Sequence, residues 1–236
     1  MEKKFVLKIG GSLLFDENLE LRENKINQFA EIIKNTKNIV AIIVGGGKVA
    51  RKYISAAEKL NAGKSLCDMF GIRVSRINAL LLITALGDKA YPEPITRVEN
   101  VRTLSIFDRI IVSGGFIPGQ STTSVALEVA EAIGATDVLI STDVDGVYNK
   151  DPNKYKDAKK YVSISISELE KVIFQTGSKN QSDPGEYRIF DAVSFHLLKR
   201  NNMELRFING EKMSDLKKIL IEKDYEANIG TKVLRD

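Results

Sequence analysis

Three short apolar runs, rich in β-branched residues, each end in a cluster of glycines. The runs are Phe5–Ile9, Ile39–Val44 and 109–113, and the clusters are Gly10-Gly11, Gly45-Gly46-Gly47 and Gly114-Gly115. In a parallel α/β sheet, turns of this kind lie together at the carboxyl edge of the strands, where ligands bind. Glycine lets the backbone approach an anion closely, and a helix that starts just afterwards directs free N–H groups at it. The sequence therefore predicts a parallel sheet with a site for a phosphate-rich ligand.

Helical patterns alternate with these runs, which is typical of an α/β fold with helices on both faces of a mostly parallel sheet. Two further strands are expected at 137–141 and 205–208. Helices are expected at 26–33, 49–60, 72–86, 122–133 and 214–221. Ser214 is the expected N-cap of the last helix, with Asp215 in its first turn. A chain of 236 residues suits one large domain, and a new strand-first unit near 136 divides it into lobes 1–135 and 136–236.

The composition excludes several kinds of chemistry. Lys and Arg total 35 against 31 Asp and Glu, and this small surplus argues against nucleic acid as the partner. The chain has one histidine, His196, one cysteine, Cys67, and no tryptophan, which leaves no basis for most zinc sites or histidine-based triads. No apolar stretch of membrane-spanning length and no signal peptide is expected, so the cytoplasm is the simplest location. Catalysis would have to depend on Lys, Arg, Asp, hydroxyl and backbone groups.

Two of the glycine turns imitate known phosphate-binding motifs without completing them. Gly45, Gly47 and Ala50 match the dinucleotide-binding pattern, but the region where its acidic residue should follow, 62–86, is mostly helical in pattern. The third turn has the glycine spacing of a P-loop, but Gln120 stands where that motif requires a lysine. Neither a Rossmann domain nor a P-loop NTPase is predicted.

The cation for a bound phosphate is expected from elsewhere. Lys8 lies near the end of the apolar strand Phe5–Ile9, directly before the first glycine turn. An unpartnered buried ammonium is costly, so a lysine here either reaches solvent or faces an anion. Arg51 follows the second turn near the start of a helix, where a cation opposes the helix dipole unless an anion lies between. Lys8 and Arg51 are therefore the candidates for stabilising phosphoryl charge.

Four segments together resemble the amino acid kinase family. They are 8–12, 45–51, 114–122 and, most specifically, the T-D-V-D-G-V-Y-N-K-D-P segment at 142–152. Within that family the resemblance is closest to archaeal-type uridylate kinases and extends from about residue 4 to Gly230-Thr231. It implies a three-layer αβα fold and transfer of the ATP γ-phosphoryl group to UMP. It also implies Mg²⁺ bound through the ATP phosphates, with no metal held by the protein itself, and a homohexamer built as a trimer of dimers.

The resemblance also implies roles for individual residues. Lys8 and Arg51 would be catalytic, the N-terminal lobe would bind the acceptor and the C-terminal lobe ATP. The implied ATP-binding residues are Gly11, Ser12, Gly47, Arg51, Thr142, Asp143, Tyr148 and Asp151. The implied UMP-binding residues are Gly46, Asp68, Phe116, Ile117, Pro118, Gly119, Gln120, Ser121 and Thr122.

The sequence departs from the family pattern at three positions. Thr123 replaces an aspartate that is common in the acceptor-binding loop of relatives, Asp143 stands where many archaeal relatives have asparagine, and His196 stands where relatives often have lysine. Asp191 keeps the familiar aspartate, with no role assigned. Two alternatives stay open. One is another kinase of the family, with a carboxylate, carbamate or isopentenyl phosphate acceptor; the other is a non-catalytic nucleotide- or oxyanion-binding protein on the same fold.

Overall fold

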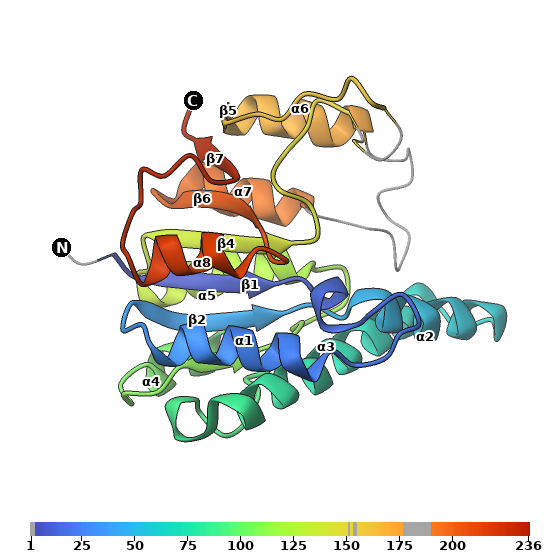
Figure 1. Cartoon of the computed structure of the whole chain (residues 1–236). Coiled ribbons are helices and arrows are strands. Elements are labelled where there is room, and N and C mark those ends of the chain that lie inside the picture. Colours follow the sequence, from blue (N-terminus) through green and yellow to red (C-terminus); the bar gives the residue numbers. More distant parts are fainter. Residues whose placement is uncertain (1–2, 151, 153–154, 177–189) are drawn as a thin grey trace.

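A computed structural model describes residues 3–150, 152, 155–176 and 190–236. These residues form one seven-stranded sheet in the order β3-β2-β1-β4-β6-β7-β5 (Figure 1). The strands are β1 (Phe5–Ile9), β2 (Ile39–Val44), β3 (Ile111–Ser113), β4 (Asp137–Thr142), β5 (Ser163–Ser165), β6 (Glu204–Asn209) and β7 (Thr231–Leu234). Neighbouring strands are parallel except for β6 and β7, so the carboxyl ends of the first four strands and β6 share one edge.

Helices cover both faces of this sheet. They are α1 (Glu23–Lys34), α2 (Gly47–Lys59), α3 (Lys64–Leu86), α4 (Glu99–Leu104), α5 (Thr122–Ile133), α6 (Ile166–Thr176), α7 (Ala192–Arg200) and α8 (Met213–Leu220), with short 3₁₀ helices η1 (Gly11–Leu14) and η2 (Gly87–Lys89). Alternate strand residues point to opposite faces. In β1, Leu7 and Ile9 join a core with α1, α3 and α8, whereas Val6 joins a second core with α5 and α7. The predicted three-layer α/β fold is confirmed.

The start of the last helix differs from the prediction. The last helix begins at Met213 with Lys212 as N-cap and no side-chain cap, so the prediction of Ser214 as N-cap was wrong; Asp215 does lie in the first turn. The Asp215 amide instead donates to the Lys212 carbonyl, which closes the turn one residue earlier. The sheet continues across residue 136, because β1 pairs with β4. The division into lobes at that residue therefore stays a prediction.

Helix α3 is longer and more apolar than the pattern predicted. It begins at Lys64, eight residues before the expected start at 72, because Gly71 interrupts the apolar pattern but not the helix. With the turn after it, Lys64–Lys89, it is long and apolar enough to cross a membrane by length and composition, so the expectation of no such stretch was wrong. Core helices pass the same test, and α3 packs against α1, α2, β2 and β3.

Candidate active site

The first two glycine turns touch each other at the carboxyl edge of β1 and β2. A Cβ on Gly11 would lie 2.3 Å from the Gly47 nitrogen, and one on Gly45 would lie 2.8 Å from the Gly11 nitrogen. Gly47 also has a φ of +65°, which side chains rarely adopt. Any larger residue would separate the turns, so glycine is required here for close backbone approach. The 3₁₀ helix that starts at Gly11 and helix α2 that starts at Gly47 therefore begin side by side.

Polar side chains of α3 hold the turns in place. Asn78 Nδ2 donates to the Gly45 carbonyl at 2.9 Å, and Ser75 Oγ accepts from the Gly115 amide at 2.9 Å. Arg76 donates through Nε to the Gly115 carbonyl and through Nη2 to the Phe116 carbonyl, both at 3.0 Å. Burial lowers the pKa of Arg76. Helix α3 thus joins the second glycine turn to the start of the third.

We call the segment 115–121 the acceptor loop. Its middle is held by Asp68, whose Oδ2 accepts from the Gly119 amide at 2.8 Å, and Gly119 has a φ of +78°. Its end, Ser121, is the N-cap of α5 and accepts from the Ser124 amide. The backbone of this loop is therefore fixed at several points although Ile117 is exposed.

A pocket of about 170 Å³ opens between α2, α3 and the acceptor loop. Residues 71, 72 and 75 of α3 form one wall. The predicted site residues that line it are Gly46, Gly47, Arg51, Asp68, Ile117, Gln120 and Thr122. The folding of the chain therefore brings together seven residues predicted from three parts of the sequence, the segment 45–51, Asp68 and the segment 116–122. Arg51 has no hydrogen-bond or ion-pair partner among the described residues, so its charge is available to a ligand.

Two buried oxygens, one near the end of the acceptor loop and one in the first turn of α5, accept no hydrogen bond from the described residues. They are Gln120 Oε1 and Thr123 Oγ1. The Gln120 amide nitrogen donates to Glu128 at 2.7 Å, which turns the side chain so that the oxygen stays free. Because a buried acceptor without a donor is costly, Gln120 on the pocket wall is suited to a ligand that carries a donor.

Lys8 lies in the middle of the sheet between β2 and β4, one residue before the end of β1. Burial lowers its pKa to about 8, an effect that the carboxylate of Asp143 partly opposes. No described residue forms a hydrogen bond or ion pair with its ammonium. An anionic ligand bound beside Gly10-Gly11 would supply the ion-pair partner that this buried ammonium lacks among the described residues.

The other predicted residues lie around β4 or outside the pocket. Thr142 is buried at the end of β4 and donates to Asp143 at 3.0 Å. The Tyr148 hydroxyl donates to Asp145 at 2.6 Å, which raises the tyrosine pKa to about 12. Gly11 and Ser12 lie beside the Gly47 turn, Phe116 packs in the core, and Pro118 is exposed. Asp151 lies outside the described residues.

Comparisons with known proteins place this geometry in a family. The family model described as "Amino acid kinase family" matches residues 3–209. The chain belongs to the amino acid kinase family. It is 41% identical to a uridylate kinase of Staphylothermus marinus, covering 93% of this chain and 95% of the relative, and 38% identical to one of Methanobrevibacter smithii, covering 98% and 99%. The crystal structure of uridylate kinase from Archaeoglobus fulgidus superimposes with a TM-score of 0.77 at 31% identity, covering 98% of this chain and all of that one.

Sequence reasoning missed the residues by which this member of the amino acid kinase family holds the segment 115–121 in place. Ser75 and Arg76 of α3 act on backbone groups about 40 positions away, and Asp191 acts on Ser121, 70 positions away. The signal available was the presence of polar residues within the otherwise apolar stretch of α3. His196, in contrast, is exposed on α7.

Proposed function

We propose that this chain is a uridylate kinase, which transfers the γ-phosphoryl group of ATP to UMP and yields ADP and UDP. The observation that carries the proposal is the pocket in which Arg51 and Asp68 face the acceptor loop beside the paired glycine turns. Relatives that bear this name match nearly the whole chain at about 40% identity. An unpartnered arginine and an aspartate in one small pocket suit a ligand with an anionic group at one end and hydroxyl donors at the other.

The groups present suit phosphoryl transfer without a general base. An oxygen of the UMP phosphate forms the new bond to the γ-phosphorus while the bond to the β–γ bridging oxygen breaks, and ADP leaves with that electron pair. The nucleophile is already an anion, so the protein supplies alignment and charge stabilisation. Lys8 and Arg51 are the proposed catalytic cations. Backbone N–H groups at Gly11 and Gly47 would direct the positive ends of their dipoles at the transferring phosphoryl group and stabilise its negative charge.

The two substrates would approach from opposite sides of Lys8. UMP would lie between Asp68 and the acceptor loop, with the second oxygen of Asp68 on the ribose hydroxyls and the base near Gln120. ATP would extend from Gly11, Ser12 and Gly47 toward Thr142, Asp143 and Tyr148 beyond β4. These placements follow the family resemblance and the positions of the residues at one sheet edge.

Mg²⁺ would enter with ATP in this proposal. A cation bound through phosphate oxygens needs no cage of protein ligands, and none of three or more His, Cys, Asp or Glu side chains is found among the described residues. Bound in this way, the ion would neutralise charge on the ATP phosphates. Buried Cys67 is a free thiol, in keeping with the reducing cytoplasm, where nucleotides are phosphorylated.

We also propose that subunits associate through the outer face of α3, as one contact of a homohexamer. Leu66, Ile77 and Leu80 are 52%, 61% and 48% exposed, and their spacing of 11 and 3 residues places them on one face of the helix. An apolar stripe of this kind is typical of an interface. Light scattering should report a smaller species for the Ile77→Lys variant, whereas Val162→Lys, at a separate apolar site 57% exposed, should leave the mass unchanged.

A coupled assay of ADP release tests the activity. The acceptors are UMP, CMP, AMP, GMP, isopentenyl phosphate and small carboxylates, each with ATP and Mg²⁺. Turnover that requires UMP, and that is lost in Lys8→Ala, supports the proposal. Turnover only on a carboxylate or isopentenyl phosphate assigns another kinase of the family, and ATP binding without turnover on any acceptor assigns a non-catalytic protein.

A further inference from the structure

Asp191 connects the N-terminus of α7 to the end of the acceptor loop. Its Oδ2 accepts from the Ser121 amide at 2.7 Å and from the Ser124 hydroxyl at 2.8 Å. Its Oδ1 accepts from the amide and the hydroxyl of Ser194, at 2.7 and 2.8 Å. One carboxylate therefore caps α7 with one oxygen and holds the start of α5 with the other.

This carboxylate has no cationic partner among the described residues. Burial alone would raise its pKa, but the donors of Ser121, Ser124 and Ser194 hold the pKa below its usual value. The starts of α5 and α7 both direct positive dipole ends at it. The charge is thus stabilised only by groups whose positions depend on the two helices staying together.

The contact differs from the others that fix the acceptor loop. Arg76 and Asp68, which hold its beginning and middle, both come from α3, a wall of the pocket. Asp191 comes from the C-terminal part of the chain and holds the last residue of the loop. Gln120 and Thr122, on either side of Ser121, line the pocket. A shift of Ser121 would therefore move two residues of the pocket wall.

We propose that Asp191 is a positioning residue for the acceptor: by fixing the Ser121 amide, it keeps Gln120 and Thr122 in place opposite Arg51 and Asp68. The inference rests on the proposed function, because the acceptor is taken to be UMP. Asp191 does not line the pocket, so it acts through the loop and not by touching the substrate.

The variant Asp191→Asn isolates this role. An amide of the same shape can present its oxygen to only one of the two backbone N–H groups and must point an NH₂ at the other. We expect a KM for UMP raised about tenfold, the size of one hydrogen bond to a charged group, with the KM for ATP within about twofold of the parent. Ser194→Ala is the matched control, since it removes a hydrogen bond from the same carboxylate on the α7 side and should leave both KM values unchanged.

Hydrogen exchange of the peptide covering 114–125 gives a readout independent of turnover. In Asp191→Asn this peptide should exchange faster, while peptides of β1 and β2 should not. Ser124→Ala, a milder change, tests the same contact if Asp191→Asn does not fold. A KM for UMP that is unchanged, or that rises together with the KM for ATP, overturns the inference, as does unchanged exchange. If the parent protein does not phosphorylate UMP, the proposed function fails, and the exchange result alone decides the role of Asp191.

Discussion

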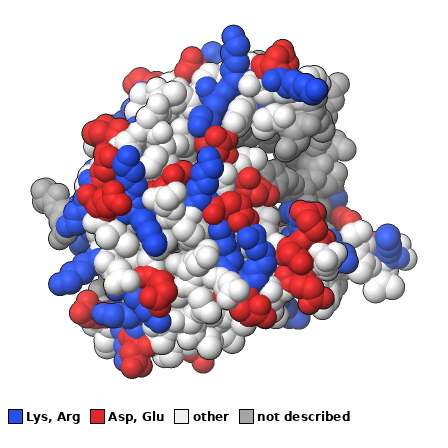
Figure 2. Space-filling view, viewed as in Figure 1, with Lys and Arg blue, Asp and Glu red and all other residues white. Residues whose placement is uncertain are grey.

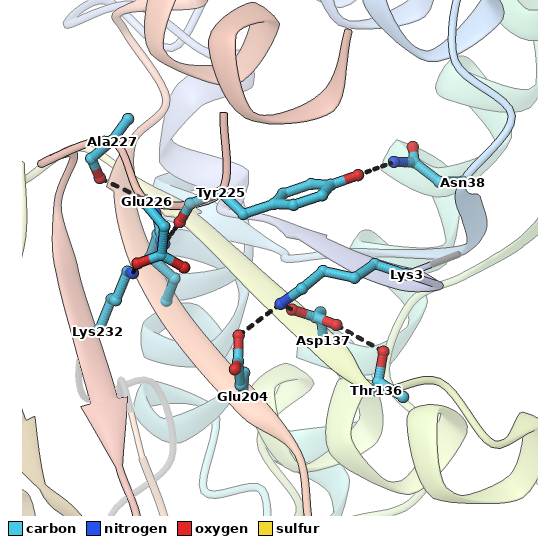
Figure 3. A network of polar contacts seen from close by, with 10 residues as sticks. Lys3, Asn38, Thr136, Asp137, Glu204, Tyr225, Glu226, Ala227 and Lys232 are labelled. Atoms are coloured by element: carbon cyan, nitrogen blue, oxygen red, sulfur yellow. Dashed lines mark hydrogen bonds and ion pairs between the residues drawn. The ribbon is translucent and has the colours of Figure 1, made fainter. Parts of the chain in front are cut away.

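The two edges of the sheet use charge in opposite ways. At the amino edge, Lys3 Nζ lies 2.6 Å from both Asp137 and Glu204 (Figure 3). The Arg206 guanidinium donates to the carbonyls of Tyr225 and Ala227. At the carboxyl edge, Lys8 and Arg51 have no such partner among the described residues. Charges paired within the protein contribute to stability, whereas cations left unpaired are available to a ligand.

The net charge of the chain does not reveal this difference between the two edges of the sheet. On the face seen in Figure 2, basic and acidic side chains are interspersed and no block of one sign stands out. The surplus of four positive charges is therefore no guide to the binding site. What marks the site is the lack of a protein partner at two cations that lie beside glycine turns.

Replacing Lys8 should produce the largest effect and separate the two edges most clearly. Lys8→Met removes a cation that stabilises phosphoryl charge, so kcat should fall about 10²-fold or more. The melting temperature should stay the same or rise, because burial of this ammonium outweighs the favourable charge of Asp143. Steady-state kinetics and calorimetry check both parts. If the Lys8→Met variant keeps its kcat and has a lower melting temperature, the prediction is contradicted, and Lys8 stabilises the fold instead of serving catalysis.

The amino edge should show the reverse pattern. Asp137 is 5% exposed and accepts from Lys3 and from the Thr136 hydroxyl at 2.6 Å. Asp137→Ala leaves the Thr136 hydroxyl without its acceptor and leaves Lys3 with Glu204 alone, so the free energy of unfolding should fall by about 2 kcal/mol. Denaturant titration measures this loss, and kcat at a temperature where the variant is folded should match the parent. A large loss of kcat in the folded variant would contradict the division between the edges.

The pH dependence of catalysis should report the unpaired lysine. Lys8 has a pKa of about 8 in the free protein, so it is charged below that pH and loses its proton above it. We expect kcat/KM for ATP to fall as pH rises through about 8, by about tenfold per pH unit once the lysine is neutral. Lys8→Arg, whose guanidinium stays charged, should remove this fall even if its activity is lower. A profile that is flat from pH 7 to 10 in the parent would show that another group carries the charge.

Sequence reasoning succeeded where local pattern and topology decide the outcome. The bounds of β1, β2 and α5 match the prediction because long apolar runs end in glycine or begin at a serine cap. The joint position of Lys8 and the glycine turns followed because parallel strands end at one edge. Strands β5 and β7, three and four residues long, were missed because, unlike the equally short β3, neither is followed by a glycine turn that marks its end.

The contacts that hold the acceptor loop could not be predicted. Arg76 and Asp191 form hydrogen bonds with backbone groups. Because nearly every residue type carries the same backbone groups, the sequence does not show which residue will be the partner. The direction of each side chain depends on how α3 and α7 pack, which is a property of the whole fold. Local pattern therefore located the turns but not what fixes them.

The smallest effect is expected for an exposed ion pair at the amino edge. It tests whether every ion pair there stabilises the fold, or only a buried one. Lys232 lies 2.6 Å from Glu226, a side chain 89% exposed, and this contact lowers the glutamate pKa. Because water competes for such a pair, Lys232→Met should leave the free energy of unfolding unchanged within the error of the denaturant titration. The same measurement on Asp137→Ala provides the comparison. Equal losses in the two variants would mean that pairing itself, independent of burial, is what distinguishes the amino edge from the unpaired Lys8 and Arg51.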